Sequence, residues 1–79
     1  MKLPRDVSAQ DLIKASKKLG YEITRQTGSH FRLYTQQNGQ HHITIPNHDP
    51  IKIGTLSAIL SDMALHFKTS KDQIIQQLF

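Results

Sequence analysis

The stretch TGSHFRLYTQQNGQHHITIP, residues 27–46, decides the fold of this chain. Apolar and polar residues alternate along residues 30–35 and again along residues 42–45, which is the period of a β-strand. Thr27-Gly28-Ser29 supplies a turn before the first run. Asn38-Gly39, whose residues both tolerate positive φ, supplies a hairpin turn between the runs. The stretch therefore predicts two antiparallel strands joined by a hairpin.

A third strand is predicted on the N-terminal side of the first turn. From Tyr21 the sequence adopts period 2, with Tyr21 and Ile23 on one side and Glu22, Thr24 and Gln26 on the other. We expect one face of the three strands to enter the core, through Ile23, Phe31, Leu33, Ile43 and Ile45. Because side chains alternate along each strand, the opposite face then presents polar, aromatic and basic groups, from His30, Arg32, Tyr34, His42 and Thr44.

A helical pattern precedes the strands. Ser8 is expected to cap this helix, with Asp11 three residues later, and apolar residues then recur at helical spacing until Gly20 ends the run. At the other end of the sheet, Pro46 closes the last strand because it has no N–H for the ladder. A polar loop, residues 47–52, follows it.

Two more helices are predicted after the loop. The first begins near Gly54 or Thr55, and its apolar arc consists of Leu56, Ile59, Leu60, Met63 and Phe67. Thr69 or Ser70 caps a last short helix that buries Ile74, Ile75 and Leu78. The order predicts an α+β fold, an αβββα two-layer sandwich whose three-stranded antiparallel sheet carries helices on one face, with an additional short C-terminal helix.

Length and composition indicate one domain, residues 1–79, with a modest core. Hydrophobic residues make up 37% of the chain, and no run approaches the ~20 apolar residues of a membrane span, so we expect a soluble protein with no membrane association. The N-terminus lacks the apolar stretch of a secretory signal, and the chain has no cysteine. Both features fit a cytoplasmic protein.

The charge is basic, at +4 with a pI near 9.7, which suggests a polyanionic partner, nucleic acid first. A surplus of this size also serves solubility alone, so composition leaves both interpretations open. On the first helix, Lys14, Lys17 and Lys18 lie opposite the apolar face. Such a face is either simply solvated or part of a nucleic-acid surface.

His30 is the candidate catalytic residue, because imidazole takes and gives protons near neutral pH and this one follows a turn at the start of a strand. A base can remove the proton from a 2′-hydroxyl of RNA, which then attacks the adjacent phosphorus while an acid protonates the leaving oxygen, without a metal. Arg32 on the same face would stabilise the phosphoryl oxygens, and Tyr34 would stack a base or donate to a phosphate. The alternative is that His30 is an ordinary surface residue.

Five histidines also invite a metal interpretation, with His41, His42 and His48 as the ligands. Neighbouring residues of a strand point to opposite faces, and neither cysteines nor an HExxH-type pattern accompanies them. The chain also has no Gly-rich phosphate loop and no nucleophile elbow. We therefore expect neither a metal nor a cofactor.

Short motifs mark the junctions between the predicted elements. They are Leu19-Gly20-Tyr21, Gly28-Ser29-His30, Ile45-Pro46-Asn47-His48, and Gly54-Thr55-Leu56 with Ile59-Leu60. With these motifs the chain resembles, over nearly its whole length, the HicA toxins, small mRNA interferases of bacterial toxin–antitoxin pairs.

The resemblance implies an αβββα fold similar to a double-stranded-RNA-binding domain, with the histidine of the Gly-Ser-His segment, here His30, as the catalytic residue. It also implies a partner, the HicB antitoxin, which covers the active surface and blocks access to RNA. His48 matches the Pro-x-His of the family, and the resemblance gives His48 and Gly28 supporting roles around the site.

The leading hypothesis is a type II toxin that acts as a metal-independent endoribonuclease on mRNA, with His30 in proton transfer. The residues expected to bind RNA are Lys14, Lys17, Lys18, Ser29, Arg32, Tyr34 and Lys52. One alternative is a non-catalytic RNA-binding module of the double-stranded-RNA-binding type, whose basic residues would serve shape recognition. A third hypothesis is a pure interaction module whose open sheet face serves only a protein partner.

Overall fold

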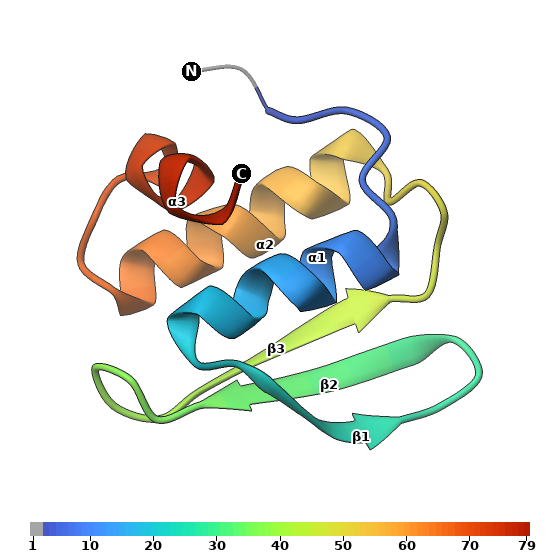
Figure 1. Ribbon diagram of the computed structural model, residues 1–79, viewed down its shortest axis with the longest axis horizontal. Coiled ribbons are helices and arrows are strands. Elements are labelled where there is room, and N and C mark those ends of the chain that lie inside the picture. The colour runs from blue at the N-terminus through green and yellow to red at the C-terminus, as the bar shows by residue number, and fades with distance from the viewer. Residues whose placement is uncertain (1–2) are drawn as a thin grey trace.

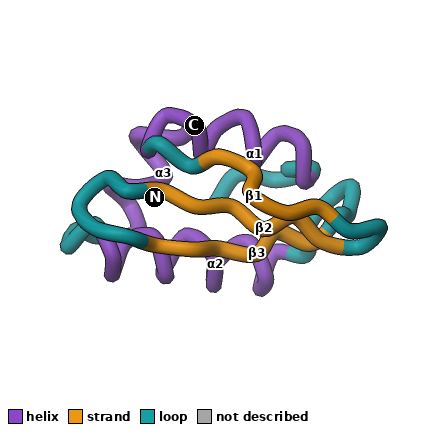
Figure 2. The backbone as a smooth tube through the Cα atoms, turned by 90° about the horizontal axis from the view of Figure 1, so that it is seen from below, coloured by secondary structure: helices purple, strands orange, loops and turns teal. Residues whose placement is uncertain are grey.

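The computed structural model describes residues 3–79, which form one antiparallel sheet with helices packed on a single face. The elements in chain order are α1 (Ala9–Ser16), the 3-10 turn η1 (Lys17–Leu19), β1 (Glu22–Gln26), β2 (His30–Thr35), β3 (His41–Pro46), α2 (Ile53–His66) and α3 (Lys71–Leu78). The strands lie in the order β1–β2–β3 (Figure 1). Figure 2 shows the strands in front, with α1 and α2 behind them on either side. The predicted α+β sandwich is confirmed.

The first helix begins and ends as its sequence predicts. The Asp11 N–H donates to Ser8 Oγ at 3.0 Å, and the Ser8 N–H donates to Asp11 Oδ2 at 3.1 Å, which is a complete capping box. After α1, the chain continues through η1 to Gly20, which has a φ of +81°. A Cβ at Gly20 would lie 2.6 Å from Nε2 of the flexible Gln37 side chain, which would have to move, so it is the backbone conformation that requires glycine here.

The hairpin between β2 and β3 confirms the predicted turn at Asn38-Gly39 and the predicted open face of the sheet. Asn38 and Gly39 have φ values of 57° and 95°, as expected for two residues that tolerate the left-handed region. The pairs facing the helices are buried, and they are Phe31 with Ile45 and Leu33 with Ile43. The alternate pairs point away from the helices, and they are Arg32 with Thr44 and Tyr34 with His42.

The prediction for β1 is wrong at Ile23 and in the second half of the strand. Ile23 pairs with Leu33 and so points toward the helices, but at the sheet edge it stays 43% exposed and does not enter the core. A β-bulge at residue 24 then breaks the alternation, so that Arg25 pairs with Arg32 and Gln26 with Phe31. Gln26 therefore lies on the same side as Ile23, contrary to the period-2 expectation, and Arg25 joins the open face.

The two later helices complete the core. α2 begins at Ile53, one residue before the predicted Gly54, and Phe67 at its end is partly buried against the core. The Gln73 N–H donates to Ser70 Oγ at 3.1 Å, so Ser70 is the cap of α3. α3 lies over α2 on the side away from the sheet (Figure 1). Its apolar side, as predicted, is buried: Ile74, Ile75 and Leu78.

Candidate active site

His30 is the first residue of β2, and its side chain is exposed on the open face of the sheet. Its Nδ1 lies 2.9 Å from Ser29 Oγ. Within residues 3–79, Nε2 has no hydrogen-bond partner. When Nδ1 carries the proton and donates it to the serine hydroxyl, the Nε2 lone pair faces solvent as a base. The imidazole is thus held at one nitrogen and open to a ligand at the other.

The turn before His30 is fixed by contacts from two directions. Thr27 Oγ1 accepts from the His30 N–H at 3.1 Å and from the Ser29 N–H at 3.4 Å. From the loop after β3, the Asn47 N–H donates to the Ser29 carbonyl at 2.8 Å, and its side-chain amide donates to the Gly28 carbonyl at 3.4 Å. The backbone on both sides of the Ser29 hydroxyl is therefore anchored, which orients the histidine that contacts it.

A surface hollow joins His30 to two arginines. It is lined by Arg25, Thr27, His30, Arg32 and Thr44. Arg25 and Arg32 occupy paired positions on β1 and β2, and Arg32 donates to Thr44 Oγ1 at 2.8 Å. Within residues 3–79, neither guanidinium is paired with a carboxylate. Like charges directly opposite in a sheet cost stability, so this pair is electrostatically suited to an anion placed between or above them.

Sequence alternation missed Arg25, because strict period 2 places it on the core side of β1. The bulge at residue 24, where Thr24 Oγ1 donates to the Arg32 carbonyl at 3.3 Å, brings it to the open face. The available signal was the arginine itself, since an unpaired charge at a predicted core position argues for an interruption of the strand.

The next row of the open face carries aromatic rings. Tyr34 of β2 and His42 of β3 are paired residues whose ring centroids lie 4.6 Å apart at an interplanar angle of 39°. Tyr34 is half-buried and His42 is exposed. Glu22 of β1 completes the row on the other side of Tyr34. The face thus places an arginine row next to His30 and a ring row beyond it.

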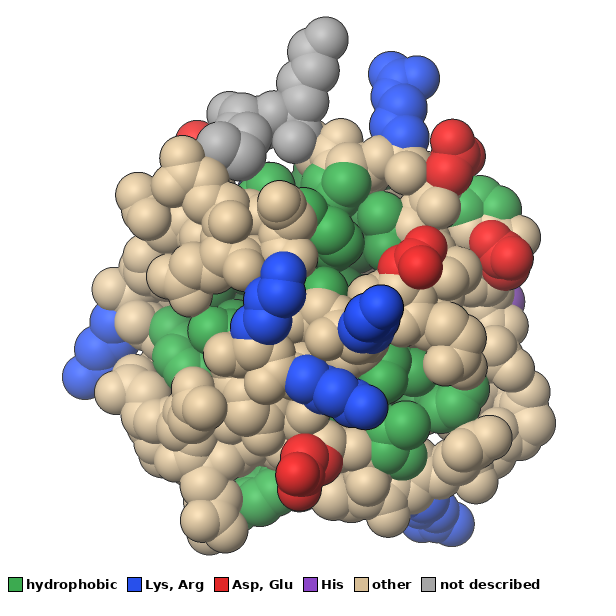
Figure 3. Space-filling model, viewed as in Figure 1, with side chains coloured by type: hydrophobic (Ala, Val, Ile, Leu, Met, Phe, Trp, Pro, Cys, Tyr) green, Lys and Arg blue, Asp and Glu red, His purple; other side chains and the backbone are tan. Residues whose placement is uncertain are grey.

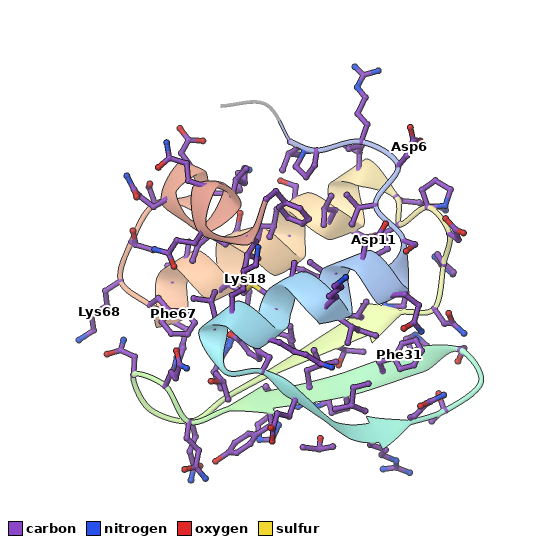
Figure 4. All side chains as sticks on the ribbon, viewed as in Figure 1. Asp6, Asp11, Lys18, Phe31, Phe67 and Lys68 are labelled. Carbon is purple, nitrogen blue, oxygen red and sulfur yellow. The ribbon has the colours of Figure 1, made fainter. Side chains whose placement is uncertain are left out.

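The predicted lysines do not line the His30 hollow in the described chain. Lys14 and Lys18 line a different hollow, beside Leu78 and Phe79, and the Lys18 ammonium donates to the Leu78 carbonyl at 3.2 Å at the end of α3. Lys17 is exposed on η1, and Lys52 precedes α2. Figure 3 shows Lys and Arg side chains gathered over α1 on the helical side. In Figure 4, Lys18 lies on the helical layer and toward α3. Phe31, the neighbour of His30, lies on the sheet at the N-terminal end of β2.

His48 and Gly28, the two predicted supporting residues, differ in their structural contacts. The His48 side chain is exposed, while its carbonyl accepts from the Ala9 N–H at 2.9 Å and so connects the loop to the start of α1. Gly28 has no atom within 4 Å of a Cβ built on it, and its φ lies outside the left-handed region. Packing within residues 3–79 therefore gives no reason for glycine at this position.

The other histidines form a separate cluster. His41 points toward Tyr21 and Asp62 while its neighbour His42 lies on the open face, which confirms that the two diverge. In the described part of the chain, no group of three or more His, Cys, Asp or Glu side chains is arranged to hold a metal ion. No helix among residues 3–79 has the length and apolarity to cross a bilayer.

The family model described as the HicA toxin of bacterial toxin–antitoxin systems matches residues 9–65. The chain belongs to the HicA toxin family. Toxins of this family are ribonucleases that pair with an antitoxin, so RNA and an antitoxin are the partners that membership implies. The match runs from α1 into α2 and includes every residue that lines the His30 hollow. No curated protein and no solved structure matches the chain.

Proposed function

We propose that this HicA toxin is a metal-independent endoribonuclease that cleaves mRNA with His30 as its catalytic residue, and that a HicB-type antitoxin silences it. The observation that carries the proposal is the hollow in which an exposed imidazole shares one surface with Arg25 and Arg32. The three groups offer a proton acceptor and two anion binders, which phosphodiester cleavage by an internal nucleophile uses together with an acid for the leaving oxygen.

The chemistry follows from the placement of these groups. Nε2 of His30 takes the proton from a 2′-hydroxyl, and that oxygen attacks the adjacent phosphorus. The bond from phosphorus to the 5′-oxygen breaks, and a proton from an acid neutralises the leaving oxygen. The products are a 2′,3′-cyclic phosphate and a 5′-hydroxyl. Arg32 and Arg25 stabilise the charge on the non-bridging oxygens through paired donors.

The arginine pair supports an anionic substrate independently of the histidine. Two guanidinium groups at paired strand positions, with no carboxylate partner in the described chain, repel one another until an anion is bound. Removing either group should weaken RNA binding and reduce its salt dependence, because each contributes counterion release. The predicted phosphate contacts of Lys14, Lys17, Lys18 and Lys52 would extend this surface around the helical side.

The test compares cleavage of single-stranded RNA by wild-type protein, His30→Ala and Gln76→Ala, each with and without EDTA. Gln76 is exposed on α3 and serves as the matched control. The expected result is cleavage by wild type and control with cyclic phosphate ends, and loss of cleavage in His30→Ala with retained RNA binding. Cleavage that disappears in EDTA would contradict metal independence. RNA binding without cleavage by wild type would identify a non-catalytic binding module instead.

A further inference from the structure

Beyond the arginine row, the open face carries a second set of groups that the cleavage chemistry does not use. Tyr34 lies four residues after His30 on the same strand and the same face, which places it about 13 Å away at the usual rise per residue. A stacked strand advances about 3.4 Å per nucleotide, so a group at this distance meets a nucleotide in the flanking sequence, about four positions from the one that is cut. This row therefore bears on recognition and not on bond breaking.

The groups of this row are suited to a base and unsuited to a phosphate. Tyr34 and His42 form a tilted ring pair, and rings of this kind stack the faces of nucleobases. Beside Tyr34 is a hollow whose polar lining includes Glu22, Gln36 and Gln37. Within residues 3–79, the Glu22 carboxylate has no cationic partner, so it would repel a phosphate in this row. It can accept hydrogen bonds from an amino-bearing base edge.

We propose that Tyr34 and His42 form a nucleobase-stacking subsite for a nucleotide in the sequence flanking the scissile bond, about four positions from it, and that Glu22 makes it prefer bases with an exocyclic amino group over uracil. The proposal rests on the proposed function for its substrate, single-stranded RNA. Stacking anchors the flanking base while Arg25 and Arg32 hold the backbone, which sets the register of the strand over His30. Uracil presents two carbonyl oxygens around its single edge N–H, and these oxygens repel a carboxylate.

The experiment measures binding in the His30→Ala background, so it does not depend on whether the protein cleaves RNA. The probes are fluorescently labelled oligo(A), oligo(C) and oligo(U) of equal length at fixed salt, read by anisotropy. The additional changes are Tyr34→Ala, Tyr34→Phe, His42→Ala and Glu22→Gln, with Phe79→Ala as a control that removes another exposed ring, 46% accessible, at the chain end.

We expect Tyr34→Ala to weaken binding about five- to a hundredfold, the range given by loss of base stacking, and His42→Ala to weaken it less. Tyr34→Phe and Phe79→Ala should bind within twofold of the parent. The parent should bind oligo(A) and oligo(C) more tightly than oligo(U), and Glu22→Gln should narrow that difference.

Three results would overturn the subsite. The first is unchanged RNA affinity in His42→Ala or in a folded Tyr34→Ala. The second is a loss in Tyr34→Phe as large as in Tyr34→Ala, which would mean that the hydroxyl acts and not the ring. The third is a loss of antitoxin binding with RNA affinity intact, which would make the row a protein interface. His42 is exposed, so His42→Ala decides the matter even if Tyr34→Ala fails to fold.

Discussion

His30 and His41 lie at opposite ends of the sheet and show what the same side chain does in two settings. His30 begins β2 opposite Pro46, is exposed, and makes one side-chain hydrogen bond within residues 3–79, to the Ser29 hydroxyl. His41 begins β3 opposite Thr35 and is largely buried. Its Nδ1 accepts from the Tyr21 hydroxyl at 2.6 Å, and its Nε2 lies 3.3 Å from Asp62 Oδ1.

The environment of His41 continues into the helical layer. The His66 ring stacks on His41 with centroids 4.4 Å apart, and its Nε2–H donates to the Gln37 carbonyl at 2.9 Å. The Asn38 amide donates to the His66 carbonyl, so the β2–β3 hairpin is connected to the end of α2. Every nitrogen of His41 is engaged, which makes it a structural residue, whereas His30 keeps one nitrogen for a ligand. Both residues are histidines, and their roles differ because one ring nitrogen of His30 has no hydrogen-bond partner within residues 3–79.

Replacing His30 or His41 singly by alanine should produce opposite phenotypes. The loss of cleavage in His30→Ala is the largest effect that we expect. His30→Ala should reduce the RNA cleavage rate by about 10²- to 10⁴-fold, the usual contribution of a general acid–base group. Its melting temperature should stay close to wild type, because the side chain is exposed. Single-turnover cleavage and a thermal melt of the same sample measure both quantities. A large fall in melting temperature would mean that His30 holds the fold together.

His41→Ala should do the reverse. It leaves the buried Tyr21 hydroxyl without its partner, which costs about 1–3 kcal/mol. For a domain of this size that lowers the melting temperature by roughly 4–24 °C, while cleavage measured below the transition is retained. His42→Ala is the matched control for stability, since the adjacent side chain is exposed on the other face. Loss of cleavage in a folded His41→Ala protein would end the division of roles between the two sites.

The environment of His30 could be predicted from the sequence, and that of His41 could not. Alternation along β2 was enough to place His30, Arg32 and Tyr34 on one exposed face, because register fixes every side chain once Phe31 and Leu33 are buried. The Tyr21–His41–Asp62 contacts join residues 20 and more positions apart, from the residue before β1, from β3 and from α2. Local periodicity carries no information about such contacts, so they became visible only with the tertiary packing.

The arginine row shows a second limit of sequence reasoning. The bulge at residue 24 is a backbone event between β1 and β2, and no residue type in the strand encodes it uniquely. One inserted position transferred Arg25 to the open face and Gln26 away from it. The lysines show another limit: helix periodicity put Lys14, Lys17 and Lys18 correctly on the solvent side of the helix. It could not say whether that side adjoins His30.

A smaller effect should appear at high pH at the His41 end of the sheet. Burial, with the nearby Asp62 carboxylate, raises the pKa of Tyr21 well above its ordinary value of 10.0. Above pH 10 the unfolded chain loses this proton while the folded chain keeps it, so the free energy of unfolding falls by about 1.4 kcal/mol per pH unit. That contribution is fully present below pH 10.

Tyr21→Phe removes this titration together with one hydrogen bond. The variant should lose about 0.5–1.5 kcal/mol near neutral pH, because the ring remains packed and only the hydroxyl is gone. Its stability should then fall less steeply than that of wild type above pH 10. Urea unfolding at several pH values measures both changes. Parallel curves for the two proteins would show that Tyr21 does not titrate differently in the folded state.

Gly20 and Gly28 extend the comparison, because Gly20 directly precedes Tyr21 and Gly28 precedes the Ser29-His30 pair. Gly20 precedes Tyr21 with a φ of +81° and Gln37 against it, so Gly20→Ala should destabilise the fold by more than about 1 kcal/mol.

Gly28 precedes Ser29 and His30 with open space around it, so Gly28→Ala should leave stability unchanged or raise it by about 0.4–1 kcal/mol, since alanine restricts the unfolded chain. If Gly28→Ala keeps its melting temperature and loses RNA cleavage, the glycine serves close approach of a ligand to the backbone beside His30. A fall in melting temperature equal to that of Gly20→Ala would instead mean that the turn before His30 depends on glycine for its own conformation.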